Sequence, residues 1–543
     1  MSGNEARLLD YESCRRLDET TIARGFSEVQ LMGQAALASL YRLEASRSLD
    51  EGRFLILCGS GNNGGDGLAL AYMLLSRNPG LRTGSNRPRV FRTGESRTKT
   101  AAFYADLLQR LGLPLEGPED FLALELSPND RIIEALLGVG QRGAPRGNLL
   151  PLLEKISGAR SGKHGPELVC LDVPVGLNEH EAREFSPPGG ALPGPEQTLP
   201  APDAIHTYGT RKLALELNAS LQAFSRIDVL PMGFYPDNSA PGAVAFSEPA
   251  PGDLADFFMK DPLGHKYSQG HGFLLGGSRG SEGALLLAAR AFFAAGGGIL
   301  HALAPDEASR GILCSSFATA MYLPRTPEIT GAVFPGALAL GPGLSPEDYR
   351  DLAPDLIAWV KRLPERYAQA GKPNPLLILD AGALPLVREP DFPDEFRARV
   401  LLTPHSGEWA RLGGPRPSHP EALREAARWN EENLGSYVLI KDAVNCLLPP
   451  RNSSEPVRIF ARPNASLAQA GSGDALTGFL LSAAARVRRD GISIPLMVGR
   501  ALELHSRATR DEIHPVADEF PDLARRVLVR DASRGEEEHE VLL

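Results

Sequence analysis

The chain has 543 residues, of which 43% are hydrophobic and 23% charged, and its net charge is −10. A single hydrophobic core stops growing at about 250–300 residues, so this length excludes one domain and predicts two. Acidic and basic residues are mixed along the chain, which argues against a nucleic-acid-binding surface because such a surface requires clustered Lys and Arg.

The first half alternates short apolar runs with helical patterns, which predicts a parallel α/β sheet covered on both faces. Residues 21–44 have helical spacing, through Phe26, Val29, Met32, Ala36, Leu40 and Leu43. The later segments in chain order are 53–57, a helix after Gly67, 87–91, a helix over 98–112, 131–138, 167–176, 204–217 and 226–234. Residues 179–203 are rich in Pro and Gly and are predicted to form a long surface loop.

The second half repeats this pattern after a predicted linker at 236–252, so we expect domains at 1–240 and 241–543. Its segments are 272–280, a helix from Glu282, 298–305, 337–343, a helix from Pro346, 376–382, 399–408, 437–448 and a helix after Asp474. The most apolar window, 283–304, contains Arg290 and many Gly and Ala residues. It predicts a buried helix and strand rather than a membrane span.

The cysteines and the first residues point to the cytoplasm. The five cysteines stand far apart without a CxxC pair, which favours reduced thiols over disulfides or a zinc site. Residues 1–21 are polar and acidic, unlike a secretory leader. We therefore expect a cytoplasmic protein that binds neither membrane nor nucleic acid.

A glycine-rich stretch, "CGSGNNGGDGLALA" at 58–71, stands between a predicted strand and a helix. Gly59, Gly61 and Gly64 fit the G-x-G-x-x-G pattern that brings the backbone close to a dinucleotide. The acidic residue expected after the next strand is missing, since Arg92 stands there, so this is not an ordinary NAD-dehydrogenase site. Amide side chains, small residues and a carboxyl could all contact a ligand here, at Asn62, Asn63, Gly64, Gly65 and Asp66. The alternative is a turn in which the aspartate only favours the helix start.

This stretch, with "LMGQAA", "EALLGVG", "LDVPVGL" and "TYGTRKLAL", resembles the N-terminal domain of the NAD(P)H-hydrate epimerases. The resemblance implies a Rossmann-like three-layer domain that binds the hydrated nicotinamide nucleotide along Asn62 to Asp66. It implies a potassium ion on Asn63, on the acid at 134 and on a serine at 175, but this chain has Glu134 and Val175. It also selects Asp172 for proton transfer at the nicotinamide ring, where a turn-capping aspartate is the alternative reading. The two departures leave open a binding module without catalysis.

A second glycine-containing stretch, "AGSGDALTGFL" at 470–480, has small residues before an aspartate at a predicted helix start. The amides of Gly471, Ser472 and Gly473 would point into one anion-binding concavity, strengthened by the helix dipole. Asp474 is placed to take a proton from a hydroxyl in phosphoryl transfer. A carboxylate that only stabilises the helix dipole is the alternative.

The second half resembles the ribokinase-like superfamily, and within it the NAD(P)H-hydrate dehydratases, through "LALGPGL", "LLILDAGAL", "LLTPHSGEWARL" and "VLIKDAVNCLL". The resemblance implies a three-layer α/β/α domain that uses ADP or ATP with Mg²⁺. It places the damaged nucleotide near Ala284, Gly343, His405 and Asp474. It places the adenine nucleotide on Lys441, Asp442, Ala443, Val444, Asn445 and Gly473. Gly382 stands where the family usually has an aspartate, and Asp442 where it has a glycine.

The order of the two resemblances is that of bifunctional bacterial repair enzymes, and it implies a homo-oligomer. The implied activity is epimerisation of the C6 hydrate of NADH or NADPH, followed by nucleotide-dependent dehydration of the S epimer. A small-molecule kinase with the same "GSGD" loop is the competing enzyme. A dehydratase joined to a non-catalytic N-terminal binding or assembly module is the other alternative.

Overall fold

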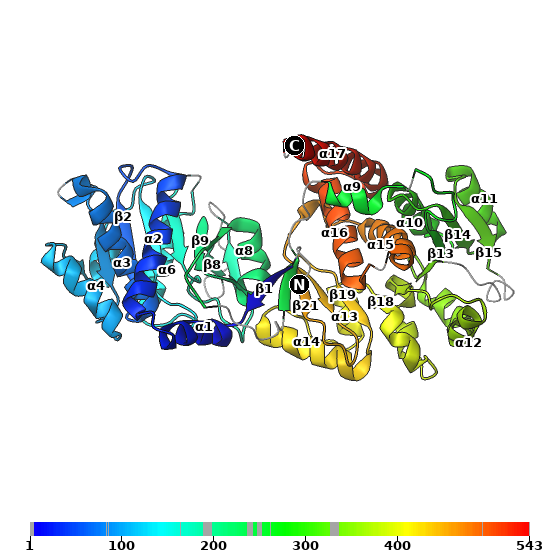
Figure 1. Ribbon diagram of the computed structural model, residues 1–543, viewed down its shortest axis with the longest axis horizontal. Helices are drawn as coiled ribbons and strands as arrows, with labels where there is room; N and C mark the ends of the chain where they lie inside the picture. The colour runs from blue at the N-terminus through cyan, green and yellow to red at the C-terminus, as the bar shows by residue number, and fades with distance from the viewer. Residues whose placement is uncertain are drawn as a thin grey trace. The chain divides into compact units, whose positions relative to one another are not determined.

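The computed structural model describes residues 5–82, 84, 86–162, 164–187, 198–235, 243–246, 252–260, 262–325, 336–490 and 492–541. These residues form two compact units (Figure 1). The N-terminal unit consists of Ala6–Ala245 with Pro417–Arg424, and the C-terminal unit mainly of Phe246–Arg416 and Glu425–Leu543. Among the described residues, no helix combines the length and the apolar character required to cross a bilayer.

The N-terminal unit is built from alternating strands and helices. Its strands are β1 (Glu5–Leu9), β2 (Phe54–Cys58), β3 (Arg89–Arg92), β4 (Leu115–Glu116), β5 (Arg131–Ala135), β6 (Glu167–Leu171), β7 (Glu184–Ser186), β8 (Thr198–Pro200), β9 (Ala204–Tyr208), β10 (Arg211–Lys212) and β11 (Arg226–Leu230). Its helices are α1 (Tyr11–Ala23), α2 (Glu28–Ser46), α3 (Asn62–Arg77), the 3₁₀ turn η1 (Pro79–Arg82), α4 (Lys99–Arg110), α5 (Pro118–Ala123), α6 (Leu149–Ala159), α7 (Leu213–Leu217) and α8 (Ala219–Phe224).

The central sheet of this unit is parallel, in the order β11-β9-β6-β5-β2-β3-β4. Alternate residues of β2 face opposite sides: Phe54 and Ile56 pack with α2, α3 and α4, whereas Leu55 and Leu57 pack with α5 and α6. Continuous apolar strands are required here because helices cover both faces. The predicted three-layer α/β domain is confirmed.

Two helix boundaries differ from the prediction. The pattern over 21–44 is interrupted, because Ser27 caps α2 in a reciprocal pair with Gln30. Helix α3 begins at Asn62 rather than after Gly67, so both asparagines belong to its first turn. Helical periodicity continues through a cap, so it could not locate either break.

The C-terminal unit has the same alternation. Strand β12 (Ala243–Phe246) spans the point in the sequence where one unit ends and the other begins. The further strands are β13 (His271–Leu275), β14 (Ile299–Ala304), β15 (Met321–Pro324), β16 (Ala337–Leu340), β17 (Leu377–Leu379), β18 (Val400–Leu402), β19 (Tyr437–Ile440), β20 (Asn445–Leu448) and β21 (Val457–Phe460). Its helices are α9 (Asp253–Phe258), α10 (Glu282–Ala294), α11 (Glu307–Ser316), α12 (Pro346–Gln369), α13 (Ser406–Arg411), α14 (Pro420–Asn433), α15 (Ser472–Asp490), α16 (Ile494–Arg510) and α17 (Phe520–Val541). Its 3₁₀ turns are η3 (Ala381–Arg388), η4 (Asp394–Arg399), η5 (Ala465–Leu467) and η6 (Ala517–Glu519).

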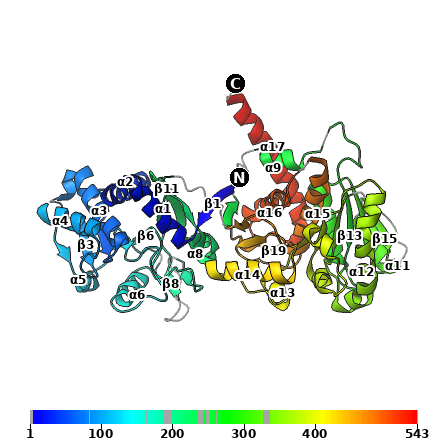
Figure 2. The same cartoon turned by 60° about the horizontal axis from the view of Figure 1, so that its bottom comes forward.

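Helices cover both faces of this second sheet, whose strands follow the order β21-β20-β19-β18-β17-β16-β13-β14-β15 (Figure 2). Helices α10, α15, α16 and α17 share one core with Leu274 of β13. On the other face the ring of Phe273 contacts Trp359 of α12, with the ring centroids 5.3 Å apart. Helices α10 and α15 lie very close because Gly478 has no side chain: a Cβ there would overlap the carbonyl of Ala288. The predicted three-layer arrangement is confirmed here too.

Three segments correct the sequence interpretation. The run 437–448 is an antiparallel hairpin of β19 and β20 rather than one strand, and β21 extends it, so this sheet is mixed. Helix α15 begins at Ser472, inside the glycine stretch. The predicted loop 179–203 contains the parallel pair β7–β8. Phe185 is buried there and Leu199 packs in the same cluster, so the segment has apolar side chains that anchor it to the core. Residues 188–197 lie outside the described residues.

The predicted linker at 236–252 lies mostly outside the described residues, although strand β12 falls within it. The apolar window 283–304 forms helix α10 and strand β14, as predicted. All five cysteines are free thiols; Cys314 is exposed and the other four are buried.

Candidate functional site

A cavity of about 520 Å³ opens at the carboxyl end of the N-terminal sheet. Asn62, Asn63 and Asp66 line it, as the glycine-rich stretch predicted. Gly64 and Gly65 do not: a Cβ at 64 would overlap the carbonyl of Gly59, and a Cβ at 65 would come within 2.5 Å of Met32 Cε. The two glycines therefore let α3 pack against the preceding loop and α2, which is a structural role rather than the predicted ligand contact.

Asp172 follows β6 and enters the same cavity. Its backbone has φ 65°, a left-handed conformation that costs about 1–3 kcal/mol for a residue other than glycine. Its Oδ1 lies 2.7 Å from Nζ of Lys212, whose side chain is only 3% exposed. That ammonium also donates to Thr207 Oγ1 at 2.7 Å. Burial opposes the charge of Lys212, but Asp172, Cys14 and Asp18 together outweigh it, so the lysine pKa is raised.

Two polar groups in this cavity have no partner within the described chain. No hydrogen bond or ion pair engages the Asp66 carboxyl, and Asn63 Oδ1 is buried without a donor while its Nδ2 donates to the carbonyl of Leu137. Burial, together with Asp172 and Asp18, raises the Asp66 pKa well above its ordinary value. Buried polar atoms are normally satisfied, so these two are candidates for ligand contact.

The predicted potassium ligands do not fit a cation. Glu134 is 2% exposed, and its carboxyl accepts from the amides of Leu136 and Val175 and from the Cys170 thiol. Burial raises the pKa of Glu134, which works against a charged ligand. The Val175 side chain packs in the core beneath. Hard cations require several free oxygen ligands, and of the three predicted ligand positions only Asn63 has a side-chain oxygen that no described residue engages.

In the C-terminal unit the predicted anion-binding amides head helix α15. Gly471 has φ 85°, which favours glycine, and Ser472 and Gly473 open the helix. A Cβ at Gly473 would lie 3.4 Å from Lys441 Nζ, so a cation adjoins the positive end of the helix dipole. The arrangement can hold a phosphate.

Asp474 follows these amides and makes no hydrogen bond or ion pair with any described residue. Burial, with the negative charge of Asp380, raises the Asp474 pKa to about 6. This carboxyl is therefore free to exchange a proton near neutral pH.

The sequence interpretation missed Asp380. It is 2% exposed and accepts from Lys441 Nζ, Thr403 Oγ1 and Thr477 Oγ1, each at 2.8 Å. The position could have been noticed, because an aspartate directly follows the buried strand in "LLILD". Through these hydrogen bonds Asp380 connects the ends of strands β17, β18 and β19 to helix α15.

His405 and the segment 441–445 end neighbouring strands, as one bridge joins His405 to Lys441. His405 Nδ1 accepts from the amides of Gly407 and Glu408, and its ring is 54% exposed. Asp442 is paired with Arg416 at 2.9 Å and accepts from the amide of Ala443. The negative charge of Asp442 is therefore balanced by Arg416, and its carboxyl is already engaged by the protein.

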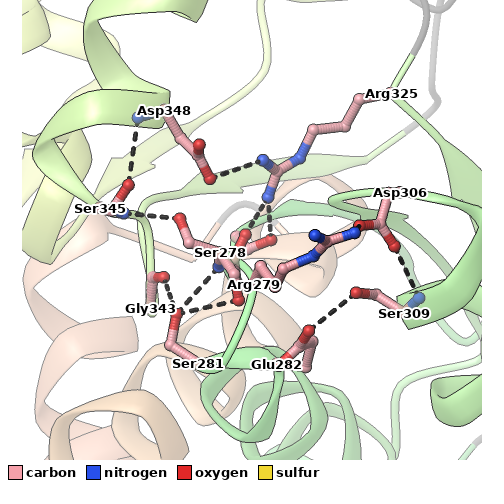
Figure 3. A network of polar contacts seen from close by, with 12 residues as sticks. Ser278, Arg279, Ser281, Glu282, Asp306, Ser309, Arg325, Gly343, Ser345 and Asp348 are labelled. Carbon is pink, nitrogen blue, oxygen red and sulfur yellow. Dashed lines mark hydrogen bonds and ion pairs between the residues drawn. The ribbon is translucent and has the colours of Figure 1, made fainter.

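Ala284 and Gly343 meet at the far part of the same edge: a Cβ at 343 would lie 2.7 Å from that of Ala284. Figure 3 shows the polar contacts that fix the loops around these two residues. Ser281 Oγ donates to the carbonyl of Gly343 at 2.6 Å. Arg325 donates to the carbonyls of Gly276 and Gly277 and lies 3.6 Å from Asp348 at the start of α12. The loops after β13 and β16 are thereby tied together.

Sequence comparison assigns a family to each half. The family described as YjeF-related protein N-terminus matches residues 28–188, and the family described as NAD(P)H-hydrate dehydratase matches residues 273–507. The first contains Asn62, Asn63, Asp66 and Asp172, and the second contains Asp380, Lys441 and Asp474.

Whole-chain relatives have the same two parts. The bifunctional NAD(P)H-hydrate repair enzyme Nnr of Moorella thermoacetica is 29% identical over 82% of this chain and 81% of its own. The Salinibacter ruber enzyme of the same description is 26% identical over 94% of both chains. A solved ADP/ATP-dependent NAD(P)H-hydrate dehydratase of Bacillus subtilis, co-crystallised with ATP and Mg²⁺, is 24% identical, with a TM-score of 0.41 over 51% of this chain and 96% of that one. The chain belongs to the family of bifunctional NAD(P)H-hydrate repair enzymes.

Proposed function

We propose that this chain repairs hydrated NADH and NADPH. Residues 1–240 exchange the two C6 epimers of the hydrate, and residues 241–543 dehydrate the S epimer with consumption of an adenine nucleotide. The order of the two matched families supports this division of work. The observation that carries the proposal is the unpartnered Asp474 carboxyl beside anion-binding amides and Lys441.

The C-terminal chemistry follows from a poor leaving group. Hydroxide leaves C6 slowly, so Asp474 takes the hydroxyl proton while that oxygen attacks the terminal phosphorus of the nucleotide. The C6–O bond of the phosphate ester then breaks, the lone pair of ring N1 fills in, and loss of a proton from C5 restores the double bond. The amides of Gly471, Ser472 and Gly473 would hold the charge of the transferred group.

The nucleotide would lie on Lys441, Asp442, Ala443, Val444 and Asn445, next to the amides that head α15. ADP is the expected donor and ATP the other candidate. Mg²⁺ is usually bound through phosphates and one or two carboxylates. This agrees with the described residues, among which no three acidic, His or Cys side chains gather to hold a metal alone. Magnesium would neutralise the phosphates, with Asp474 as the one free carboxyl close to the amides.

The damaged nucleotide would lie against Ala284, Gly343 and His405. The His405 ring is exposed and its Nδ1 is occupied as a helix cap, so Nε2, which lies 3.6 Å from Glu408 Oε2, would face the nicotinamide amide or the C6 hydroxyl. In the N-terminal half, Asn62, Asn63 and Asp66 would contact the same substrate, with Asp172 in proton transfer. Potassium is left out of this proposal because Glu134 is already engaged by the protein.

The test is recovery of nicotinamide absorbance from a mixture of both hydrate epimers with ADP or ATP. Full recovery requires both halves. Recovery of about half, given nearly equal epimers, would mean that only the dehydratase works and that the N-terminal half is a binding module. A stable phosphorylated product formed with ATP would indicate a small-molecule kinase instead. No recovery with either nucleotide would refute the proposal. A cytoplasmic, homo-oligomeric enzyme remains our expectation.

A further inference from the structure

The N-terminal cavity holds more acid–base chemistry than one aspartate. Asp18, Asp66, Asp172 and Lys212 all line it, and each carboxyl comes from a different element. Asp66 belongs to α3, directly after β2, and Asp172 follows β6; strand β5 lies between those two strands. Strands two positions apart are separated by about 10 Å, so the two carboxyls enter the cavity from separate parts of its wall.

The two carboxyls have opposite surroundings. Lys212 holds Asp172 at Oδ1, and the second oxygen of that carboxylate lies towards Gly138, where a Cβ would be 3.7 Å from it. Asp66 has no donor among the described residues, and the nearby charges of Asp18 and Asp172 favour its neutral form. One carboxyl is held by a lysine and the other has no donor among the described residues, which is an arrangement suited to a base and an acid.

We propose that Asp66 and Asp172 act as an acid–base pair on C6 of the hydrate, with Lys212 as the positioning residue that holds Asp172 at Oδ1. This inference rests on the proposed epimerase function. The carboxyl of Asp66 gives its proton to the hydroxyl, the C6–O bond breaks, and water leaves as the N1 lone pair forms a C6=N1 bond. A water molecule then adds to C6 from the opposite face while Asp172 takes one of its protons, and the electron pair returns to N1. The oxygen count is unchanged, and solvent exchange returns the two protons.

The strained backbone of Asp172 supports this arrangement. A left-handed conformation at a residue with a Cβ persists only where the surroundings impose it, and such residues cluster at active sites. The orphaned Oδ1 of Asn63 lies in the same cavity wall and can accept from the carboxamide of the substrate. The cavity thus offers a proton donor, a proton acceptor and a group that orients the ring.

The experiment measures epimer exchange by the full-length chain without adenine nucleotide, so that dehydration does not occur. The reaction is run in ¹⁸O-labelled water, and the hydrate epimers are separated and their masses are measured by mass spectrometry. The proposal expects one labelled hydroxyl per exchange event. Retention of the original oxygen during the first turnovers would mean that the ring opens instead, and it would overturn the proposal.

Substitutions locate the two groups. Asp66→Asn and Asp172→Asn should each slow exchange by at least about 10²-fold. Asp66→Asn should also remove the loss of rate at high pH that a neutral acid produces. Lys212→Met should slow exchange, because Asp172 Oδ1 then loses the ammonium that orients it, and Lys212→Arg should restore part of the rate. Asp106→Asn, at an exposed carboxyl paired with Arg110 on α4, is the matched control and should exchange as the unmodified chain does.

The outcomes separate the two proposals. If the unmodified chain exchanges epimers no faster than buffer, the proposed epimerase function fails. If the unmodified chain is active and Asp66→Asn retains its rate and pH profile, only the acid–base pair is refuted. Unfolded variants are recognised by thermal melting of the N-terminal unit. In that case Asp66→Glu replaces Asp66→Asn and should keep part of the activity.

Discussion

The two candidate sites use a lysine differently. In the N-terminal unit Lys212 is paired directly with Asp172, the carboxylate that we assign to proton transfer. In the C-terminal unit Lys441 is paired with Asp380, and the reactive Asp474 is left without a partner. In our proposals one lysine is paired with the base itself, whereas the other adjoins the phosphate-binding amides; burial and the charge of Asp380 raise the pKa of Asp474 to about 6. A lysine near an aspartate does not by itself reveal which of these roles it has.

The strongest way to break this comparison is Asp474→Asn. The change keeps the size of the side chain but removes the proton acceptor, so dehydration should fall about 10³-fold. Epimer exchange should continue, because it takes place in the other unit. Both rates can be followed on one preparation by separating the hydrate epimers and NADH. Equal loss of the two activities would mean that the substitution acts on folding rather than chemistry.

Lys441→Met should lower stability most among the charge changes. It leaves Asp380 buried without its cation, which costs about 3 kcal/mol even though two threonine hydroxyls remain. Urea unfolding of the C-terminal unit measures the loss. The double variant Lys441→Met with Asp380→Asn should recover much of it, and failure to do so would show that the pair is not the source of the effect.

The pH dependence of dehydration sharpens the assignment of Asp474. Its base form is the carboxylate, and its pKa of about 6 means that the fraction in that form falls as the pH drops below 6. We expect kcat/KM at limiting substrate to fall about tenfold for each pH unit below about 5. A profile that stays flat from pH 7 to pH 5 would contradict Asp474 as the base.

Arg325→Met tests the network of Figure 3. The guanidinium holds the carbonyls of Gly276 and Gly277, and without it the loops beside Ala284 and Gly343 should position the substrate less well. The expected result is a rise of about three- to tenfold in KM with kcat nearly unchanged. Arg279→Met, which removes only an exposed pair with Asp306, is the control and should have little effect.

The smallest expected effect concerns potassium. Replacing KCl with choline chloride should move the melting temperature of the N-terminal unit by less than about 1 °C, because Glu134 already uses its oxygens within the protein. The double variant Glu134→Asp with Val175→Ser should gain potassium-dependent stability. Clear stabilisation of the unmodified chain by potassium would show that the carboxyl can turn towards a cation.

Local patterns predicted the scaffold well. Apolar runs located β2, β5 and β6, and the two glycine stretches marked the helix starts that head both sites. The partners could not be predicted, because Asp172 and Lys212 lie 40 residues apart and meet only when β6, β9 and β10 are in place. Asp380 was overlooked for the same reason: its value depends on Thr403, Lys441 and Thr477, which come from three separate segments. The need for glycine at 64 and 65 was attributed to a ligand. A side chain at either position would instead overlap the protein itself.

The close crossing of α10 and α15 has a consequence for engineering the C-terminal half. Ala288 lies one helical turn beyond Ala284, and Gly478 lies one turn beyond Asp474. The point where the helices cross is therefore one turn from Ala284, on the proposed substrate side, and one turn from the proposed base Asp474. A methyl group at 478 would push the helix axes apart and widen the gap that the reacting atoms must span. Gly478, for which we propose no ligand contact, thus sets the distance between helices α10 and α15.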